Sequence, residues 1–131
     1  MANLARIAAP DFDSSNPATT NKITGMLAGE LLAKGDAVYM KSDGRWWKAT
    51  GAAADALAKM KGLAGTAASA GEAVTVVGPG WRWKYGAGLT PGAQYFLGTA
   101  GLLGDAATTG GTSVVAVAVS DTDILLTGVQ N

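Results

Sequence analysis

The chain has 131 residues, the usual size of one domain, and this length is enough to bury a modest core. Ten basic and ten acidic residues give a formal net charge of zero, which excludes charge-driven binding to nucleic acid or an anionic membrane, and no apolar run approaches the roughly 20 residues that span a bilayer. The absence of cysteine excludes disulfides and thiolate chemistry, and the absence of histidine removes the commonest general base and metal ligand.

Residues 1–22 differ in composition from the rest of the chain. Prolines and small polar residues break any regular period there, and the long apolar core of a signal peptide is missing. We predict an extended N-terminal arm over residues 1–22 and one β-rich domain over residues 23–131. The arm is either a frayed terminus or a segment that becomes ordered on a neighbouring subunit. In the second case it is mobile in the free protein, the domain folds without it, and its apolar anchors are Leu4, Ile7 and Phe12.

The first part of the domain predicts a short strand and then a hairpin. Residues 23–32 favour a strand. Residues 36–41 and 46–50 are two apolar runs on either side of Asp43 and Gly44. An Asp-Gly pair between such runs is a strong signal of a tight turn, so we expect antiparallel pairing of the two runs.

The middle of the chain predicts further strands with turns between them. Residues 52–61 are rich in alanine and allow one helical turn, whereas residues 59–67 favour a strand because Gly62 and Gly65 weaken a helix. Residues 72–78 contain three valines, which favour β structure. In residues 81–85 aromatic and basic side chains alternate, as expected of a strand with two different faces.

The C-terminal stretch, residues 89–126, predicts three more short strands, at residues 94–97, 113–119 and 124–127. Turns rich in glycine, threonine and aspartate separate them. Short strands at nearly regular spacing indicate an all-β domain, and we predict a small β-sandwich or barrel.

Aromatic side chains are the best candidates for an interaction surface. Trp81, Trp83 and Tyr85 share one strand face and either fill the core or stack on a sugar or a partner. Trp46 and Trp47 are adjacent in a strand, so they point to opposite faces, and at most one packs in a one-sided core. We therefore include all five among the candidate partner-binding residues.

The polar residues give little indication of catalysis. Asp121 and Asp123 share a face if the chain is extended, but their place between two apolar runs favours turn chemistry over a paired-carboxylate site. No spacing matches a calcium loop, a phosphate-binding glycine loop or an activated serine. We expect a protein without enzymatic activity, with no catalytic residue, no cofactor and no metal site.

Three stretches, residues 29–50, 61–80 and 88–126, carry a resemblance to a known family. The last contains Leu-Thr-Pro-Gly, then Tyr and Leu, Gly-Leu, Val-Ala-Val and a closing Leu-Leu. The matching positions are Leu89, Pro91, Gly92, Tyr95, Leu97, Gly101, Leu102, Val115, Val117, Val119, Asp123, Leu125 and Leu126. In this order of strands and turns the chain resembles the capsid decoration, or head cement, proteins of tailed phages, and a similar order recurs in phage fibre modules.

The resemblance implies a tulip-like β domain that binds the outer surface of the phage capsid. Its partners would be the major capsid protein and further copies of itself on the capsid lattice, with no nucleic acid and no membrane involved. The protein would assemble in the host cytoplasm, which the lack of cysteine fits, and act in the virion. The alternative is a module of a tail fibre or spike, in which the Trp and Tyr face binds a host glycan.

Overall fold

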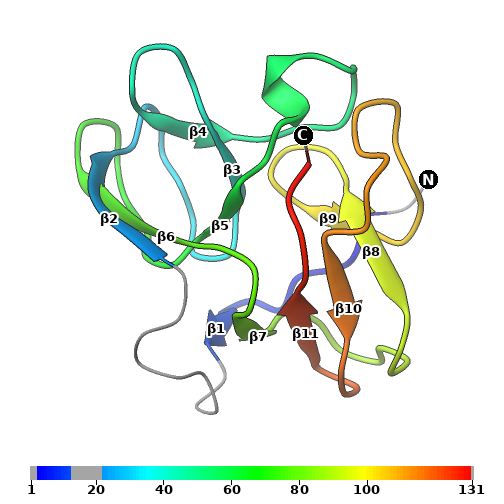
Figure 1. Cartoon of the computed structure of the whole chain (residues 1–131). Coiled ribbons are helices and arrows are strands. Elements are labelled where there is room, and N and C mark those ends of the chain that lie inside the picture. Colours follow the sequence, from blue (N-terminus) through cyan, green and yellow to red (C-terminus); the bar gives the residue numbers. More distant parts are fainter. Residues whose placement is uncertain (1–2, 13–21, 131) are drawn as a thin grey trace.

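The computed structural model of the protein describes residues 3–12 and 22–130. Over these residues the fold is all-β, with two antiparallel sheets and a single 3-10 turn, η1 (Ala56–Ala58) (Figure 1). The six-stranded sheet has the order β1 (Asp11–Phe12), β7 (Arg82–Lys84), β11 (Asp123–Leu126), β10 (Ala116–Ala118), β8 (Gln94–Leu97) and β9 (Leu103–Gly104). The five-stranded sheet has the order β2 (Lys22–Leu27), β6 (Ala73–Val77), β5 (Gly62–Ala64), β3 (Ala37–Met40) and β4 (Trp46–Lys48).

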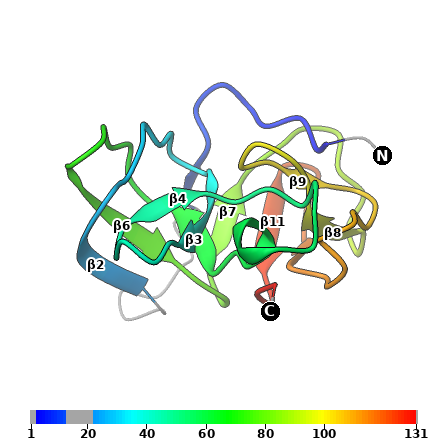
Figure 2. The same cartoon turned by 90° about the horizontal axis from the view of Figure 1, so that it is seen from above.

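The two sheets lie side by side and share one core. Figures 1 and 2 show the five-stranded sheet on one side of the molecule and the six-stranded sheet on the other. Neither sheet closes on itself, so the predicted all-β fold is confirmed and the sandwich alternative describes it better than the barrel. The largest buried cluster takes residues from both sheets, including Tyr39 and Leu63 from one and Trp83, Leu97 and Ile124 from the other.

The five-stranded sheet is apolar on both faces because neighbouring strand residues alternate between two clusters. Leu63 of β5 belongs to the core shared with the other sheet, and the next residue, Ala64, belongs to a second cluster. That second cluster is closed by Ala28, Leu32 and Ala68, which come from loops and are buried. This sheet therefore has no solvent face over its centre, which is why Trp46 and Trp47 can point to opposite faces and both pack against apolar residues.

The predicted hairpin is confirmed. Met40 pairs with Trp46 and Val38 with Lys48, and Gly44 has a φ of 77° in the turn. The Asp43 carboxylate accepts the N–H of Arg45 at 2.9 Å, which is the local hydrogen bond that makes aspartate favourable in turns.

The other predicted elements lie where the sequence placed them, but several are shorter than predicted. The predicted strand over residues 113–119 is ordered as a strand only in β10. The N–H of Ser113 donates to the side-chain oxygen of Gln130 at 2.8 Å, so the chain leaves the sheet register at that end. The alanine-rich segment makes only η1, capped by the Asp55 carboxylate, which accepts the N–H of Leu57.

Residues 3–12 of the predicted arm lie on their own domain. The N–H of Ile7 donates to the carbonyl of Tyr85 at 2.9 Å, and β1 pairs antiparallel with β7. The Arg6 guanidinium donates to the Asp36 carboxylate at 2.7 Å. This part of the arm thus connects the two sheets, whereas the sequence led us to expect order only on a neighbour. Residues 13–21 lie outside the described part of the chain.

Candidate functional site

Most of the aromatic side chains proposed for partner binding belong to the core. Trp83 of β7 and the residues on either side of that strand, Trp81 and Tyr85, are all buried in the core shared by the two sheets. Trp46 is buried in the second cluster. In this fold the core alternative describes these four side chains, and it leaves little of their surface for a partner. The physical reason is that a small domain with only two phenylalanines fills its core with Trp and Tyr.

Trp47 is the one of the five that keeps part of its surface accessible. It points to the face opposite Trp46, as predicted, and packs against the shared core while remaining half-buried. The Lys41 ammonium lies 4.2 Å from its ring centroid, and its indole N–H donates to the Asp43 carboxylate, with 3.1 Å to Oδ2. Gly29 lies directly against the same ring, where a Cβ atom would overlap it. Lys41 and Gly29 leave little of the ring available for stacking on a ligand.

The three apolar residues of the arm have different positions. Leu4 is half-buried and packs against the shared core. Ile7 is half-buried beside β7, where its N–H is held by Tyr85. Phe12 pairs through its backbone with Trp83, and its side chain lies outside what the structure describes. Leu4 and Ile7 are thus already in partial contact with their own domain.

Four of the six large apolar side chains that are exposed among the described residues lie on β2 and the loop after it, which the sequence prediction did not single out; the other two are Leu57 and Val119. Every residue of β2 is exposed, and its apolar side chains Ile23, Met26 and Leu27 have exposed fractions of 49%, 36% and 38%. Leu31 in the following loop is 68% exposed. Figure 1 shows β2 at the outer edge of its sheet. We call these four residues the β2 strip.

The position of β2 in the sheet order explains the exposure. Ile23 pairs with Val76 and Met26 with Val74, so both lie on the face that carries the second cluster. Between these pairs β2 has two residues, Thr24 and Gly25, where β6 has one, which is a β-bulge. The bulge keeps both apolar side chains on one face, but no described strand lies beyond β2 to cover them. Sequence alone gives an apolar run here and cannot distinguish an edge strand from a central one.

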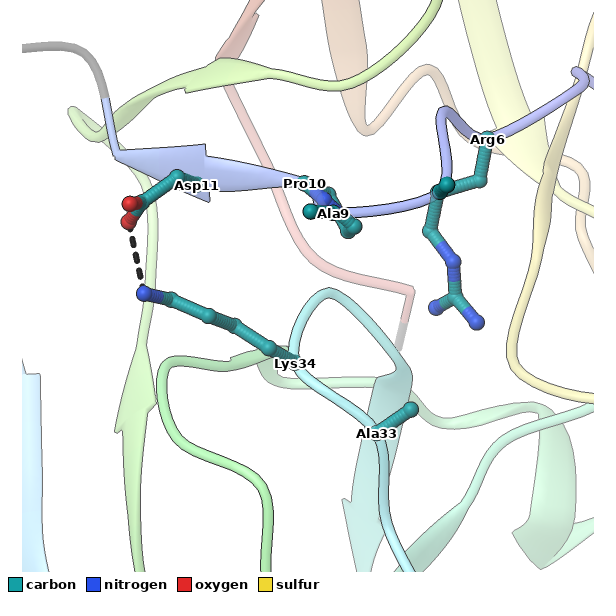
Figure 3. A pocket seen from close by; sticks show the side chains of 7 residues that line it. Arg6, Ala9, Pro10, Asp11, Ala33 and Lys34 are labelled. Atoms are coloured by element: carbon teal, nitrogen blue, oxygen red, sulfur yellow. Dashed lines mark hydrogen bonds and ion pairs between the residues drawn. The ribbon is translucent and has the colours of Figure 1, made fainter.

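A shallow crevice separates the arm from the loop before β3. It has a volume of about 300 Å³ and is lined by the arm and by Ala33 and Lys34 (Figure 3). At one end of the crevice the Lys34 ammonium forms an ion pair with the Asp11 carboxylate, at 2.6 Å. The arm therefore forms one wall of the crevice, and an ion pair closes its end.

A buried polar group lies behind this crevice. Asp36 is only 2% exposed, and its carboxylate accepts hydrogen bonds from Arg6 and from the N–H of Ala33 at 2.8 Å. Tyr85 lies near both charges, and its Oη accepts the N–H of Leu103 at 3.1 Å. Burial raises the pKa of Tyr85 to about 12, although the hydrogen bond from Leu103 and the charge of Arg6 act in the opposite direction. These groups satisfy one another.

The second partly buried ion pair is also structural. The Asp123 carboxylate, which is buried, accepts the Arg82 Nε–H at 2.9 Å and the Thr122 hydroxyl at 2.8 Å. Ser120 Oγ accepts the N–H of Asp123 at 3.0 Å. Asp121 is not part of this group, so the two aspartates do not form a paired-carboxylate site. The turn chemistry favoured for this segment is present, with Ser120 as the acceptor.

Comparisons with known proteins add no family. Neither the models of known protein families nor the curated proteins include a match to this chain. Among the described residues no three or more acidic side chains gather where they would hold a metal ion, and no helix has the length and apolar character needed to cross a membrane. The β2 strip is thus the feature of the described surface that most needs a functional explanation.

Proposed function

We propose that this chain is a structural virion protein that binds the outer surface of a phage capsid and stabilises contacts between major capsid subunits. Two observations support the proposal. The order of turns and strands over residues 29–127 resembles head cement proteins, and the matching residues serve the fold. The observation that carries most weight is the β2 strip, because four exposed large apolar side chains on one edge strand and the loop after it indicate contact with another protein chain.

Such a function needs no chemistry, so we propose no enzymatic activity, cofactor or metal. A protein that binds only the assembled shell stabilises it by mass action, since the free subunits do not bind it. Many copies on one lattice add avidity to weak single contacts. The zero net charge removes the repulsion that would otherwise keep neighbouring copies apart.

The alternative, a fibre or spike module that binds host glycan, loses its main support. It rested on Trp81, Trp83 and Tyr85 as a stacking platform, and these side chains are in the core. Trp47 is the remaining aromatic candidate, and Lys41 already lies over its ring.

Cosedimentation of the purified protein with undecorated shells of its virion tests the proposal. We expect saturable binding with a fixed number of copies per shell. The control is the host cell-surface polysaccharide at the same mass concentration, to which we expect no binding. Saturable binding to the polysaccharide without binding to shells would overturn the proposal in favour of the fibre alternative.

A further inference from the structure

We propose that β2 pairs antiparallel with β2 of a second copy of this chain across a two-fold axis, with Ile23 of each copy opposite Met26 of the other. This contact between copies goes beyond capsid binding and does not depend on it. It would join two five-stranded sheets into one continuous sheet. The argument uses the edges of the two sheets, the bulge in β2 and the charges at its ends.

Among the described sheet edges, β2 is the one without protection. The edges of the six-stranded sheet, β1 and β9, are two residues long, and Asn3 forms a bridge to Gly104 at the second of them. The far edge of the five-stranded sheet, β4, is covered because Ala28 forms a bridge to Trp46. In contrast, β2 has six residues, all exposed, and Lys22 is its single charged residue. Natural edges of this length usually carry more charge or a proline that prevents pairing.

The bulge makes β2 complementary to itself. Ile23 and Met26 lie on one face, and Lys22 and Leu27 lie on the other, with Thr24 and Gly25 between them. A two-fold axis perpendicular to the sheet at the bulge keeps each face on its own side. It therefore brings Ile23 of one copy opposite Met26 of the other, twice, as direct cross-strand apolar pairs. The axis also closes the assembly at two copies, because each copy uses its one open edge.

The charges at the two ends of β2 fit the same arrangement. Lys22 is at the start of the strand. Glu72 is at the other end, since its carbonyl accepts the N–H of Ala28 at 2.8 Å and the next residue, Ala73, pairs with Leu27. An antiparallel pair brings Lys22 of one copy to the end that carries Glu72 of the other. A parallel pair would instead place like charges together.

Sedimentation equilibrium of the free protein gives the first test. We expect a reversible dimer, and we expect Ile23→Lys to raise its dissociation constant at least tenfold because the new charge lies in the cross-strand pair. The matched control is Leu57→Lys, which charges another exposed apolar side chain far from β2, on η1, and should leave dimerisation unchanged. A dimer that tolerates Ile23→Lys, or that is lost equally with Leu57→Lys, would overturn the proposal.

Charge reversal tests the orientation without changing the apolar residues. Lys22→Glu should weaken the dimer about fivefold, and adding Glu72→Lys should recover part of the loss, since opposite charges again face each other at both ends. The recovery is partial because the Glu72 carboxylate also accepts the N–H of Ser69 in its own chain at 2.6 Å. If the double variant instead loses more dimer affinity than Lys22→Glu alone, the antiparallel arrangement is wrong.

A single cysteine tests the position of the axis, since the chain has none of its own. Thr24 lies next to the proposed axis, within the roughly 4.4–6.8 Å between Cα atoms that a disulfide requires. Thr24→Cys should oxidise to a covalent dimer, whereas Thr109→Cys, at another exposed position, should not. The pairing of copies would be overturned if the wild-type protein is a monomer and the Ile23→Lys variant no longer binds shells. In that case this edge binds the capsid subunit. A dimer that fails to bind shells would overturn only the proposed function.

Discussion

Asp36 is the residue at which the arm, the loop before β3 and the region around Tyr85 meet. Its buried carboxylate is balanced by Arg6, which comes from the arm. Gly101 lies close to the same carboxylate, and its carbonyl accepts the N–H of Ala37 at 2.8 Å. The arm therefore contributes a charge that the domain cannot replace, because a buried carboxylate without its cation is costly.

Arg6→Ala should lower the free energy of unfolding by roughly 3 kcal/mol, since among the described residues it leaves the buried carboxylate with the N–H of Ala33 as its one remaining partner. Urea unfolding measures the change. The control is Lys34→Ala, which removes the exposed ion pair with Asp11 and should cost less than about 1 kcal/mol. Equal losses in the two variants would mean that burial of Asp36 has no energetic consequence.

The raised pKa of Tyr85 predicts that the free energy of unfolding falls at alkaline pH. Its pKa of about 12 in the folded protein is above the ordinary value of 10.0, so from pH 10 to 12 the unfolded chain binds fewer protons than the folded one. The free energy of unfolding should therefore be unaffected by Tyr85 below pH 10 and fall above it, by up to about 1.4 kcal/mol per pH unit. Burial also raises the pKa of Tyr39 and Tyr95, which adds to the fall.

Tyr85→Phe separates the two effects of this residue. At pH 7 it should lower the free energy of unfolding by about 1–3 kcal/mol, because the buried N–H of Leu103 loses its acceptor. Above pH 10 its stability should fall less steeply than that of the wild type. Parallel pH profiles of the two proteins, measured by urea unfolding, would contradict the assignment.

At the scale of elements, the hairpin of β3 and β4 depends on one backbone conformation. Gly44 has a φ of 77° and open space around it, so a side chain there meets strain and no clash. Gly44→Val should lower the midpoint of thermal unfolding, at a cost of roughly 1–2 kcal/mol, and Gly44→Asn should cost less because asparagine tolerates positive φ. An unchanged midpoint in the valine variant would show that the turn does not limit stability.

Local patterns predicted the elements well because strands and turns depend on short-range preferences. The Asp43-Gly44 pair predicted the turn of the hairpin, and the alternation in residues 81–85 predicted the strand β7. The same patterns could not show that β2 is an edge strand, since its apolar run resembles that of a central strand. They also could not show that Arg6 reaches Asp36, a contact between residues 30 positions apart. The candidate surface therefore came from sheet order, which local sequence does not encode.

At the scale of the whole molecule, the described residues form two buried clusters, and most of their exposed large apolar side chains lie at the β2 edge. The first cluster lies between the two sheets, and the second covers the other face of the five-stranded sheet. Residues 3–12 connect the two sheets through backbone hydrogen bonds and the Arg6–Asp36 ion pair. Ile23 and Met26 continue the face of the second cluster to the edge of the sheet, where no described strand follows.

The thermal stability of the shell is the property that a capsid-stabilising protein must change. Undecorated shells of the virion are heated with increasing amounts of the protein, and their disassembly is followed by light scattering. If the protein binds the assembled shell alone, as proposed, the midpoint of disassembly should rise with protein concentration and reach a plateau when every site is filled. A midpoint that does not change while the protein remains folded would contradict a role in stabilising the capsid.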